Sequence, residues 1–241
     1  MKRSLIAVTA GLAVVQAGPG ITGLAAVRNA FFPGLSGIGM SDHVALTFDD
    51  GPDQEATPLV LDALRERRVR ATFFLLGSRV AMMPKLACEI VDAGHEVAVH
   101  GWDHRYLPLR GPLATHDHLT WTVDAITSAT GVAPRLFRPP YGVLSGPAIV
   151  AARRLGLRPV LWSCWGREWT REATPFSVFE TLKQDLRGGA TVLLHDSDST
   201  SPAGSARRAL GALPLLLDEC ANLELRVGPL GEHASRYAPR P

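Results

Sequence analysis

Cysteine is scarce in this chain, and the few cysteines that occur form no recognisable pattern. The 241 residues include three, Cys88, Cys164 and Cys220, which lie far apart and form no CxxC pair. This number and spacing predict neither a disulfide framework nor a cysteine-ligated zinc knuckle. We interpret all three as small buried hydrophobic residues. The alternative is one disulfide between two of them in an exported protein.

A strong excess of charge of one sign is also absent. The 25 lysines and arginines nearly balance the 23 aspartates and glutamates, and the formal net charge is +2. A broad positive field that would attract nucleic acid is therefore excluded, and no nucleic-acid partner is expected. The basic run Arg65, Arg67, Arg68 and Arg70 falls at the end of an expected helix, where we interpret it as a solvated face.

The chain lacks an apolar run of the length that an ordinary membrane span needs. Lys2 and Arg3 precede an apolar stretch over residues 5–15, which Gln16 and the following glycines and proline interrupt. A basic start, a short apolar stretch and the small residues of Val15-Gln16-Ala17 predict an export signal, and hence a secreted or cell-envelope protein. The alternatives are an uncleaved membrane-associated segment and an apolar N-terminal helix of a cytoplasmic protein.

From residue 43 onward, short β-branched and aromatic runs alternate with longer amphipathic ones. This alternation predicts βα units, an α/β fold and a parallel sheet. Strands are expected at 43–48, 71–76, 96–100, 136–138, 158–162, 191–194 and 223–227. One helix is expected to start with Thr57 as N-cap, and another, over 83–93, to end at Gly94. We expect residues 1–40 to be a hydrophobic segment and linker, and residues 41–241 to form one domain.

Polar residues follow several of the expected strands: Asp49 and Asp50, His100, Arg138 and His195. In a βα barrel the carboxyl ends of the strands converge on one face, so these side chains can meet although they are far apart in sequence. The two aspartates precede a Gly-Pro turn, in which one carboxylate can bind a cation while the other acts as a base. The alternative is an aspartate-rich turn that satisfies its own backbone.

His100 and His104 are four residues apart at the end of an expected strand, and Asp50 supplies a carboxylate. Two histidines and one carboxylate with an open position form the ligand set of a catalytic zinc site. We therefore expect one divalent metal ion, Zn²⁺ first, although Co²⁺, Ni²⁺ or Fe²⁺ would accept the same ligands. Asp103 is expected to orient a neighbour or cap a turn rather than to bind the ion.

Five motifs occur in the order seen in one enzyme family. They are Thr47–Pro52, the His-x-x-x-His pair, Arg138–Gly142, Trp162–Trp169 and Leu193–Asp196. The chain from about residue 43 to 227 thus resembles the polysaccharide deacetylases with a NodB homology domain, carbohydrate esterase family 4. The resemblance implies a distorted (β/α)7-type barrel and a hydrolase that removes N-acetyl groups from N-acetylglucosamine-type sugars. Alternatives are an amidohydrolase of the same fold acting on a small or lipid-linked acetylated compound, and an inactive sugar-binding module.

The resemblance also implies roles for the residues of these motifs. Asp50, His100 and His104 would bind the metal ion, Asp49 would take a proton from the attacking water, and His195 would protonate the leaving amine. Arg138 would lie against Asp49 and keep it ionised. The metal ion and a backbone amide near Tyr141 would hold the developing oxyanion. The substrate, an acetylated glycan, would contact Pro139, Tyr141, Trp169 and Leu193, the last of these around the acetyl methyl group.

The chain departs from the family pattern at three positions. Gly101 stands where Ser or Thr is frequent, and Trp165 where an acid is frequent. Glu168 replaces an aspartate that polarises the catalytic histidine, and we expect its charge to raise the pKa of His195. The alternative is a solvated Glu168, with Asp196 or Asp198 orienting His195 instead. The polar loop over residues 197–201 is either a substrate contact or simply solvated.

Overall fold

The computed structural model describes residues 14–32 and 34–233 of the chain, and its centre is a parallel sheet. The strands are β1 (His43–Asp49), β2 (Thr72–Leu75), β3 (Glu96–Val99), β4 (Leu136–Phe137), β5 (Arg158–Pro159), β6 (Cys164–Trp165), β7 (Thr191–His195) and β8 (Arg226–Gly228). Their order is β5-β4-β3-β2-β1-β7-β6, with β8 on β1, and every pair is parallel. The expected parallel α/β architecture is confirmed.

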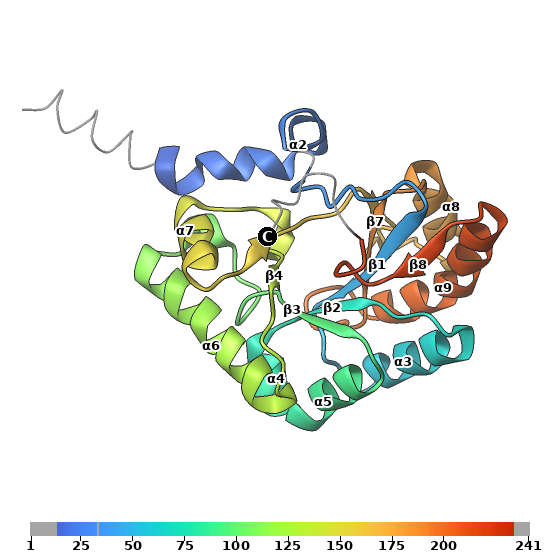
Figure 1. Cartoon of the computed structure of the whole chain (residues 1–241), viewed down its shortest axis with the longest axis horizontal. Coiled ribbons are helices and arrows are strands. Elements are labelled where there is room, and N and C mark those ends of the chain that lie inside the picture. Colours follow the sequence, from blue (N-terminus) through green and yellow to red (C-terminus); the bar gives the residue numbers. More distant parts are fainter. Residues whose placement is uncertain (1–13, 33, 234–241) are drawn as a thin grey trace, which may run out of the picture.

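Helices cross over between the strands, as parallel pairing requires, and lie around the outside of the sheet (Figure 1). They are α3 (Ala56–Arg67), α4 (Gly77–Met82), α5 (Pro84–Asp92), α6 (Pro112–Thr130), α7 (Gly146–Arg154), α8 (Pro175–Asp185) and α9 (Ser205–Asn222), with 3₁₀ turns η2 (Leu107–Leu109) and η3 (Pro140–Gly142). The strand β1 is buried over its whole length at the centre of the sheet. The helices therefore shield the sheet from solvent, so that polar side chains at the ends of its strands can be buried.

Local sequence signals account for the ends of several helices. Thr174 caps α8 by accepting from the N–H of Ser177, and Pro175 fills the first helical position. Gly94 follows α5 with φ +84°, as expected, because this left-handed conformation suits glycine. Thr57 is not an N-cap, which corrects the sequence-based expectation. Helix α3 already begins at Ala56, whose N–H donates to the carboxylate of Asp53.

The strands differ from expectation in the second half of the sheet. The stretch 158–162 forms only the two-residue strand β5, and the last strand starts at Arg226 because Leu223 still terminates α9. Strand β6, Cys164–Trp165, was not expected. Its two residues pair with Val192 and Leu193 of β7, and such a short pairing leaves no periodic pattern in the sequence.

The three cysteines are free, so the disulfide alternative is wrong for this structure. Cys164 and Cys220 are buried in the core, as expected. Cys88 is only partly buried, contrary to expectation, because it lies on the outer side of α5. Its Sγ is 3.5 Å from Oδ2 of Asp92, one turn further along the helix.

The segment before β1 contacts the barrel at several points. It includes η1 (Gly18–Gly23) and α2 (Ala25–Phe31). The amide of Gln16 donates to two carbonyls of the loop 108–110, and the backbone O of Leu35 accepts from Leu161 at 2.7 Å. Arg28 is 4% exposed and donates to the carbonyl of Trp162 at 2.9 Å. The N-terminal segment is therefore attached to the barrel by side-chain and backbone hydrogen bonds.

The described part of the chain contains no helix that is both long enough and apolar enough to cross a membrane. Most of the expected export signal, residues 1–13, lies outside the described residues.

Candidate active site

A cavity of about 280 Å³ opens at the carboxyl ends of β1 and β7 and beside the loops that follow β3 and β4. It is lined by Asp49, Asp50, His100, His104, Tyr141, Gly142, Trp162, Trp165, Trp169, Leu193, His195 and residues 200–202. These side chains come from segments up to 150 residues apart in sequence. The convergence expected from the strand ends is therefore present, and most of the candidate residues share one cavity.

Backbone conformations that favour glycine cluster around this cavity. Asp50, His104 and Tyr141 have positive φ values of 76°, 54° and 59°. Such conformations cost free energy in non-glycine residues and tend to occur where function fixes the geometry. Gly101 has φ +97°, a conformation in which a side chain would be strained.

Asp50, His100 and His104 form a compact cluster of metal-ligating atoms. Oδ1 of Asp50 lies 3.2 Å from Nε2 of His100 and 3.4 Å from Nε2 of His104. All three atoms lie within 4.8 Å of one another, and no other group of this kind occurs in residues 14–32 and 34–233. Oδ1 is buried and has no hydrogen-bond partner. A divalent cation would supply the missing partner, so the residues present fit the expected ion.

The surroundings prepare these side chains to act as ligands. Nδ1 of His100 is 2.9 Å from the backbone O of Arg138, which fixes the proton on Nδ1 and leaves the lone pair of Nε2 facing Asp50. Burial lowers the pKa of His104 to about 4, so its ring is neutral near pH 7. Burial alone would raise the pKa of Asp50, but the electrostatic attraction of the three neighbouring histidines outweighs it and holds that pKa below its ordinary value. A carboxylate and two neutral imidazoles are the forms that bind metal ions.

Asp49 is the second aspartate of the cavity, and it is paired with a buried arginine. Nη1 of Arg138 donates to Oδ1 of Asp49 at 2.6 Å, and both side chains are almost fully buried. Arg138 also donates to Oγ1 of Thr47 and to the carbonyl of Leu161, and its guanidinium lies over the ring of Phe74. These contacts fix the arginine, which in turn pins one oxygen of Asp49.

His195 and Glu168 form a second buried pair in the cavity. Nδ1 of His195 lies 2.8 Å from Oε1 of Glu168, which is fully buried. Burial alone would lower the pKa of His195, but the charge and hydrogen bond of Glu168 outweigh it and raise that pKa to about 10. Glu168 is thus not solvated. The two alternative partners are engaged elsewhere, Asp196 with Oγ1 of Thr57 and Asp198 with the N–H groups at the start of α9.

Aromatic rings form one wall of the cavity. Trp169 meets the ring of His195 edge-on at 5.6 Å, and Trp165 and Trp162 continue the row with ring separations of 5.1 and 5.5 Å. Tyr141, 60% exposed, stands at the opening against the ring of His104. The three tryptophans and Tyr141 together offer apolar faces on which a sugar ring can stack.

The family resemblance implied that two further residues, Leu193 and Pro139, contact the substrate, but only one of them lines the cavity. Leu193 lines the cavity and is 2% exposed. Pro139 is buried and does not line the cavity, and its carbonyl accepts from the N–H of Gly142 at 2.9 Å. In this structure Pro139 therefore shapes the turn that carries Tyr141 and does not face a substrate directly.

The loop after β7 contributes residues whose part in the site the sequence left open. Oγ1 of Thr200 donates to Oδ2 of Asp50, so that this oxygen is paired while Oδ1 is not. Ser201 and Pro202 line the same side of the cavity. The sequence signal was only a polar run after His195, which is also typical of a solvated loop.

Asp103, which was not expected to bind the ion, lies outside the ligand cluster and pairs with Arg110 at 2.7 Å.

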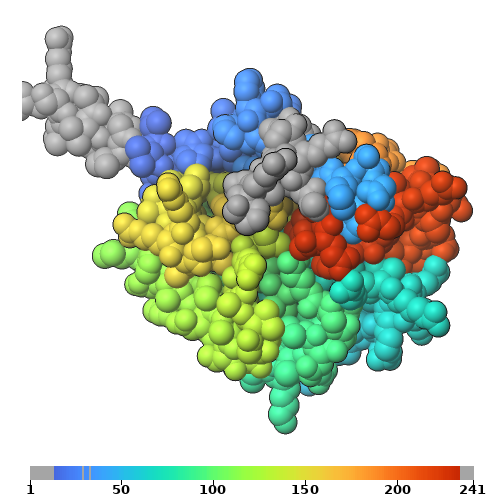
Figure 2. All heavy atoms as spheres, in the orientation of Figure 1, coloured from blue at the N-terminus to red at the C-terminus, as the bar shows by residue number. Residues whose placement is uncertain are grey.

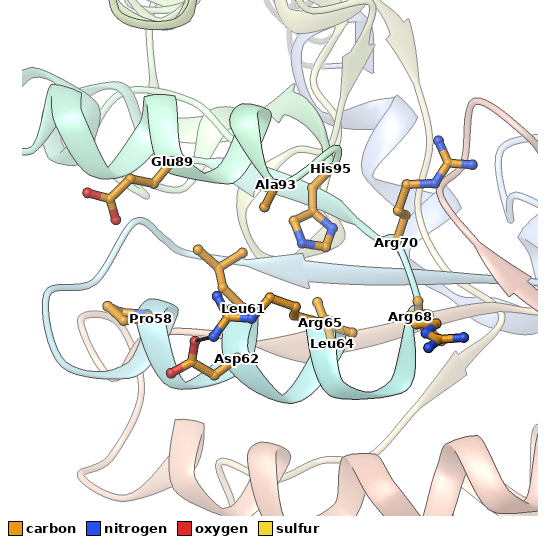
Figure 3. Close-up of a pocket in the computed structure, with 11 residues that line it drawn as sticks. Pro58, Leu61, Asp62, Leu64, Arg65, Arg68, Arg70, Glu89, Ala93 and His95 are labelled. Carbon is orange, nitrogen blue, oxygen red and sulfur yellow. Dashed lines mark hydrogen bonds and ion pairs between the residues drawn. The ribbon is translucent and has the colours of Figure 1, made fainter.

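A second cavity, of about 480 Å³, lies between α3 and α5 (Figure 3). His95 points into it, and burial lowers the pKa of this histidine to about 4. Arg65 and Arg70 at its rim are paired with Asp62 and Glu232. Two of its arginines are thus paired and its histidine is neutral, which agrees with a solvated face for this basic run and gives the cavity no catalytic constellation.

Fold and site together define a class of protein, a parallel α/β barrel with acid–base groups and a candidate metal cluster gathered at the strand ends. Residues 38–160 match the polysaccharide deacetylase family. The chain is also 38% identical over 194 residues to a chitooligosaccharide deacetylase of Bradyrhizobium sp., an alignment that covers 78% of this chain and 88% of the relative. The chain therefore belongs to the polysaccharide deacetylase family.

Solved structures agree with this assignment. A family 4 carbohydrate esterase from Streptomyces lividans, in complex with acetate, superposes with a TM-score of 0.72 at 32% identity, covering 83% of this chain and all of the other. A family 4 pseudoenzyme from Bacillus anthracis gives a TM-score of 0.73 at 26% identity, covering 80% and 65%. The expected NodB-type distorted (β/α)7 barrel is thereby confirmed.

Proposed function

We propose that this chain is a metal-dependent deacetylase that hydrolyses the acetamide of N-acetylglucosamine residues in a glycan. The observation that carries the proposal is the unpaired buried Oδ1 of Asp50 facing two imidazoles, in the same cavity as Asp49 and His195. Similarity over most of the chain to a chitooligosaccharide deacetylase supports short N-acetylglucosamine oligomers as the first substrate to test.

Asp50, His100 and His104 are the residues that would hold the ion, with Zn²⁺ as the first choice and Co²⁺, Ni²⁺ or Fe²⁺ as alternatives. The ion would act as a Lewis acid toward the acetamide oxygen and would acidify water in its open position. Thr200 holds the second oxygen of Asp50, which restricts the carboxylate to binding through Oδ1.

Asp49 is proposed to act as the general base. Arg138 pins Oδ1 of Asp49 at 2.6 Å, which leaves Oδ2, 3.8 Å from Nε2 of His100, on the side of the cluster. Oδ2 takes a proton from the attacking water as the new C–O bond forms. The buried guanidinium of Arg138 neutralises the carboxylate between turnovers.

His195 is proposed to act as the general acid. Glu168 holds the Nδ1 proton, so that Nε2, 3.8 Å from Oδ2 of Asp50, carries the proton available to substrate. With its pKa raised to about 10, His195 is protonated near neutral pH. Nε2 donates its proton to the amine nitrogen as the C–N bond breaks, which releases acetate and a free amino sugar.

The remaining residues of the cavity bind and orient the sugar. Tyr141 and Trp169 are proposed to stack on sugar rings, and Leu193 to enclose the acetyl methyl group. Because a backbone N–H costs no reorganisation, the amide near Tyr141 is proposed to hold the oxyanion on the turn that Pro139 supports.

Acetate release tests the proposal. The protein is stripped with a chelator, reloaded separately with each of the four metal ions, and assayed on N-acetylglucosamine oligomers, peptidoglycan, acetylated xylan and small acetylated amino-sugar conjugates. We expect metal-dependent acetate release that is fastest on the oligomers. Turnover confined to the small conjugates would instead support the alternative of a small-molecule amidohydrolase, and chelator-insensitive turnover would remove the metal from the mechanism.

The similarity to a pseudoenzyme favours a second candidate, a sugar-binding module without catalysis. Every acid–base and ligand position is occupied in this chain, which supports an active enzyme. Calorimetry with the oligomers separates the two candidates. Binding without acetate release under all four metal ions would establish the module.

Export of the protein is a separate proposal, supported by the basic and apolar character of residues 1–15. The N-terminal sequence of the protein purified from its host tests it. An intact chain in the envelope fraction, which keeps residues 5–15, or a mature chain that begins at Gly18 would support export, and an intact Met1 in a cytosolic fraction would contradict it.

A further inference from the structure

An apolar groove lies between the N-terminal segment and helix α7, away from the catalytic cavity. Its volume is about 590 Å³, and its walls include Pro19, Ile21, Phe32, Leu144, Ile149 and Pro159. None of these residues lines the catalytic cavity. Figure 2 shows the N-terminal residues in blue, lying on the surface of the domain beside the yellow region that includes α7.

Large apolar side chains around this groove are unusually exposed. Ile21, Phe32 and Ile149 expose 55%, 49% and 40% of their surface, although all three are large hydrocarbon side chains that water solvates poorly. Their sequence neighbours Phe31 and Val150 are exposed to 74% and 51%. Single exposed apolar residues are ordinary on soluble proteins, whereas several around one groove mark an interaction surface.

The charges near the groove are of one sign. Arg158 is the only charged residue that lines it, and exposed Arg153 and Arg154 end helix α7. Within the part of the chain that the structure describes, none of these three arginines has an ion pair with a carboxylate. The first acidic residue in the whole sequence is Asp42, so the N-terminal segment carries no negative charge. An anionic surface would therefore be attracted to this side of the molecule.

The sequence that leads to the groove has the same character. Residues 5–15 are apolar, Lys2 and Arg3 precede them, and the first wall of the groove follows at Gly18. One short apolar anchor binds a bilayer weakly, and a second apolar or basic contact makes the binding stable. We propose that the groove and its exposed apolar rim rest on a bilayer with anionic headgroups, with the arginines of α7 at headgroup level. This surface does not depend on the proposed deacetylation.

Vesicle binding of the full chain tests the surface. With vesicles of phosphatidylcholine and phosphatidylglycerol in equal parts, we expect Phe32→Ser with Ile149→Ser to lower the bound fraction. Arg153→Gln with Arg154→Gln should weaken binding by roughly tenfold, as should omission of phosphatidylglycerol. Leu59→Ser is the matched control, because Leu59 is 46% exposed on the distant helix α3. If both double variants bound vesicles as well as the parent, vesicle binding would be attributed to residues 1–15 alone, and the proposal would be overturned.

The depth to which the groove enters the bilayer distinguishes the proposal from anchoring by residues 1–15 alone. In vesicles with brominated acyl chains, Ile149→Trp should lose more fluorescence than Leu59→Trp, since only the first would reach the hydrocarbon. Equal quenching of the two variants would overturn the proposal. So would a dimer in sedimentation that Ile149→Ser dissociates, with no vesicle binding, because the groove would then cover a second copy. Acetate release from soluble oligomers should match the parent in every variant.

Discussion

Two sets of charged residues in the catalytic cavity differ in how their buried charges are paired. We call them the acid–base side and the ligand side. On one side Asp49 is neutralised by Arg138, and His195 is held by Glu168, so each charged group has a protein partner. On the other side Oδ1 of Asp50 is buried between two imidazoles and has no hydrogen bond. A buried carboxylate oxygen without a partner costs free energy that a bound cation would recover. On the first side only Oε2 of Glu168 lacks a hydrogen bond, in a carboxylate whose other oxygen is paired with His195, whereas on the second side we propose that a cation supplies the missing partner of Asp50.

The largest effect is expected where the ligand cluster itself is broken. His104→Ala removes one of two nitrogen ligands, so the variant should lose the ion and lower turnover by at least about a thousandfold. Metal content by elemental analysis and acetate release are the measurements. His116→Ala, which changes a histidine outside the cavity, is the control. Full metal occupancy in the His104 variant would remove this residue from the ligand set.

The acid–base side should respond without losing the ion. Asp49→Asn and His195→Ala each remove a proton-transfer group, so turnover should fall by at least about a hundredfold while metal content stays at the parent level. The comparison of the two sides fails if either variant is isolated without metal. It also fails if either variant turns over a good substrate at a near-normal rate.

Glu168 allows a finer test, through the pH profile. His195 must be protonated to act as the acid, so activity is lost as pH rises through its pKa, which Glu168 raises. Glu168→Gln removes the charge, lowers that pKa and should move the alkaline limb of kcat/KM to lower pH by roughly one unit or more. Glu168→Asp keeps the charge and should shift it less. Superimposable profiles for the parent and the Gln variant would mean that Glu168 does not tune His195.

The smallest effect is expected at Thr200. Its hydroxyl contacts the proposed metal ligand Asp50, but Thr200 is not itself an expected ligand. Thr200→Val removes the hydrogen bond to Oδ2 of Asp50 while keeping the shape of the side chain. Metal affinity, measured by competition with a chromogenic chelator, should fall by about tenfold, and turnover at saturating metal should change little. Thr200→Ser, which keeps the hydroxyl, should restore the affinity. An unchanged affinity in the Val variant would reduce Thr200 to a lining residue.

The sequence predicted the parts of the site that strand ends position. Asp50 follows β1 and His100 follows β3, and although β2 lies between them, parallel strands bring their carboxyl ends to one edge whatever the loops do. Glu168 lies in a less regular stretch, yet the structure places it against His195, as the family pattern of an acid at this position had suggested.

Other features depended on the path of loops, which periodic patterns do not record. The contact of Thr200 with Asp50 requires a particular course of the chain after β7, and a threonine in a polar run gives no sign of it. Thr57 looked like a helix cap because of its type and the proline after it. In the structure its hydroxyl instead donates to the buried carboxylate of Asp196, a partner 139 residues away.

Arg28 has a consequence for what counts as one unit of this protein. The match to the polysaccharide deacetylase family begins at residue 38. The unit that folds cooperatively is defined differently. It includes every residue whose removal would leave a buried polar group without a hydrogen-bond partner. Arg28 lies ten residues before that match and donates to the carbonyl of Trp162, in the wall of the catalytic cavity. The region that matches the family and the set of residues that support the cavity therefore have different boundaries, and a chain begun at residue 41 would keep the site residues while losing the hydrogen bond of Arg28 to the aromatic wall.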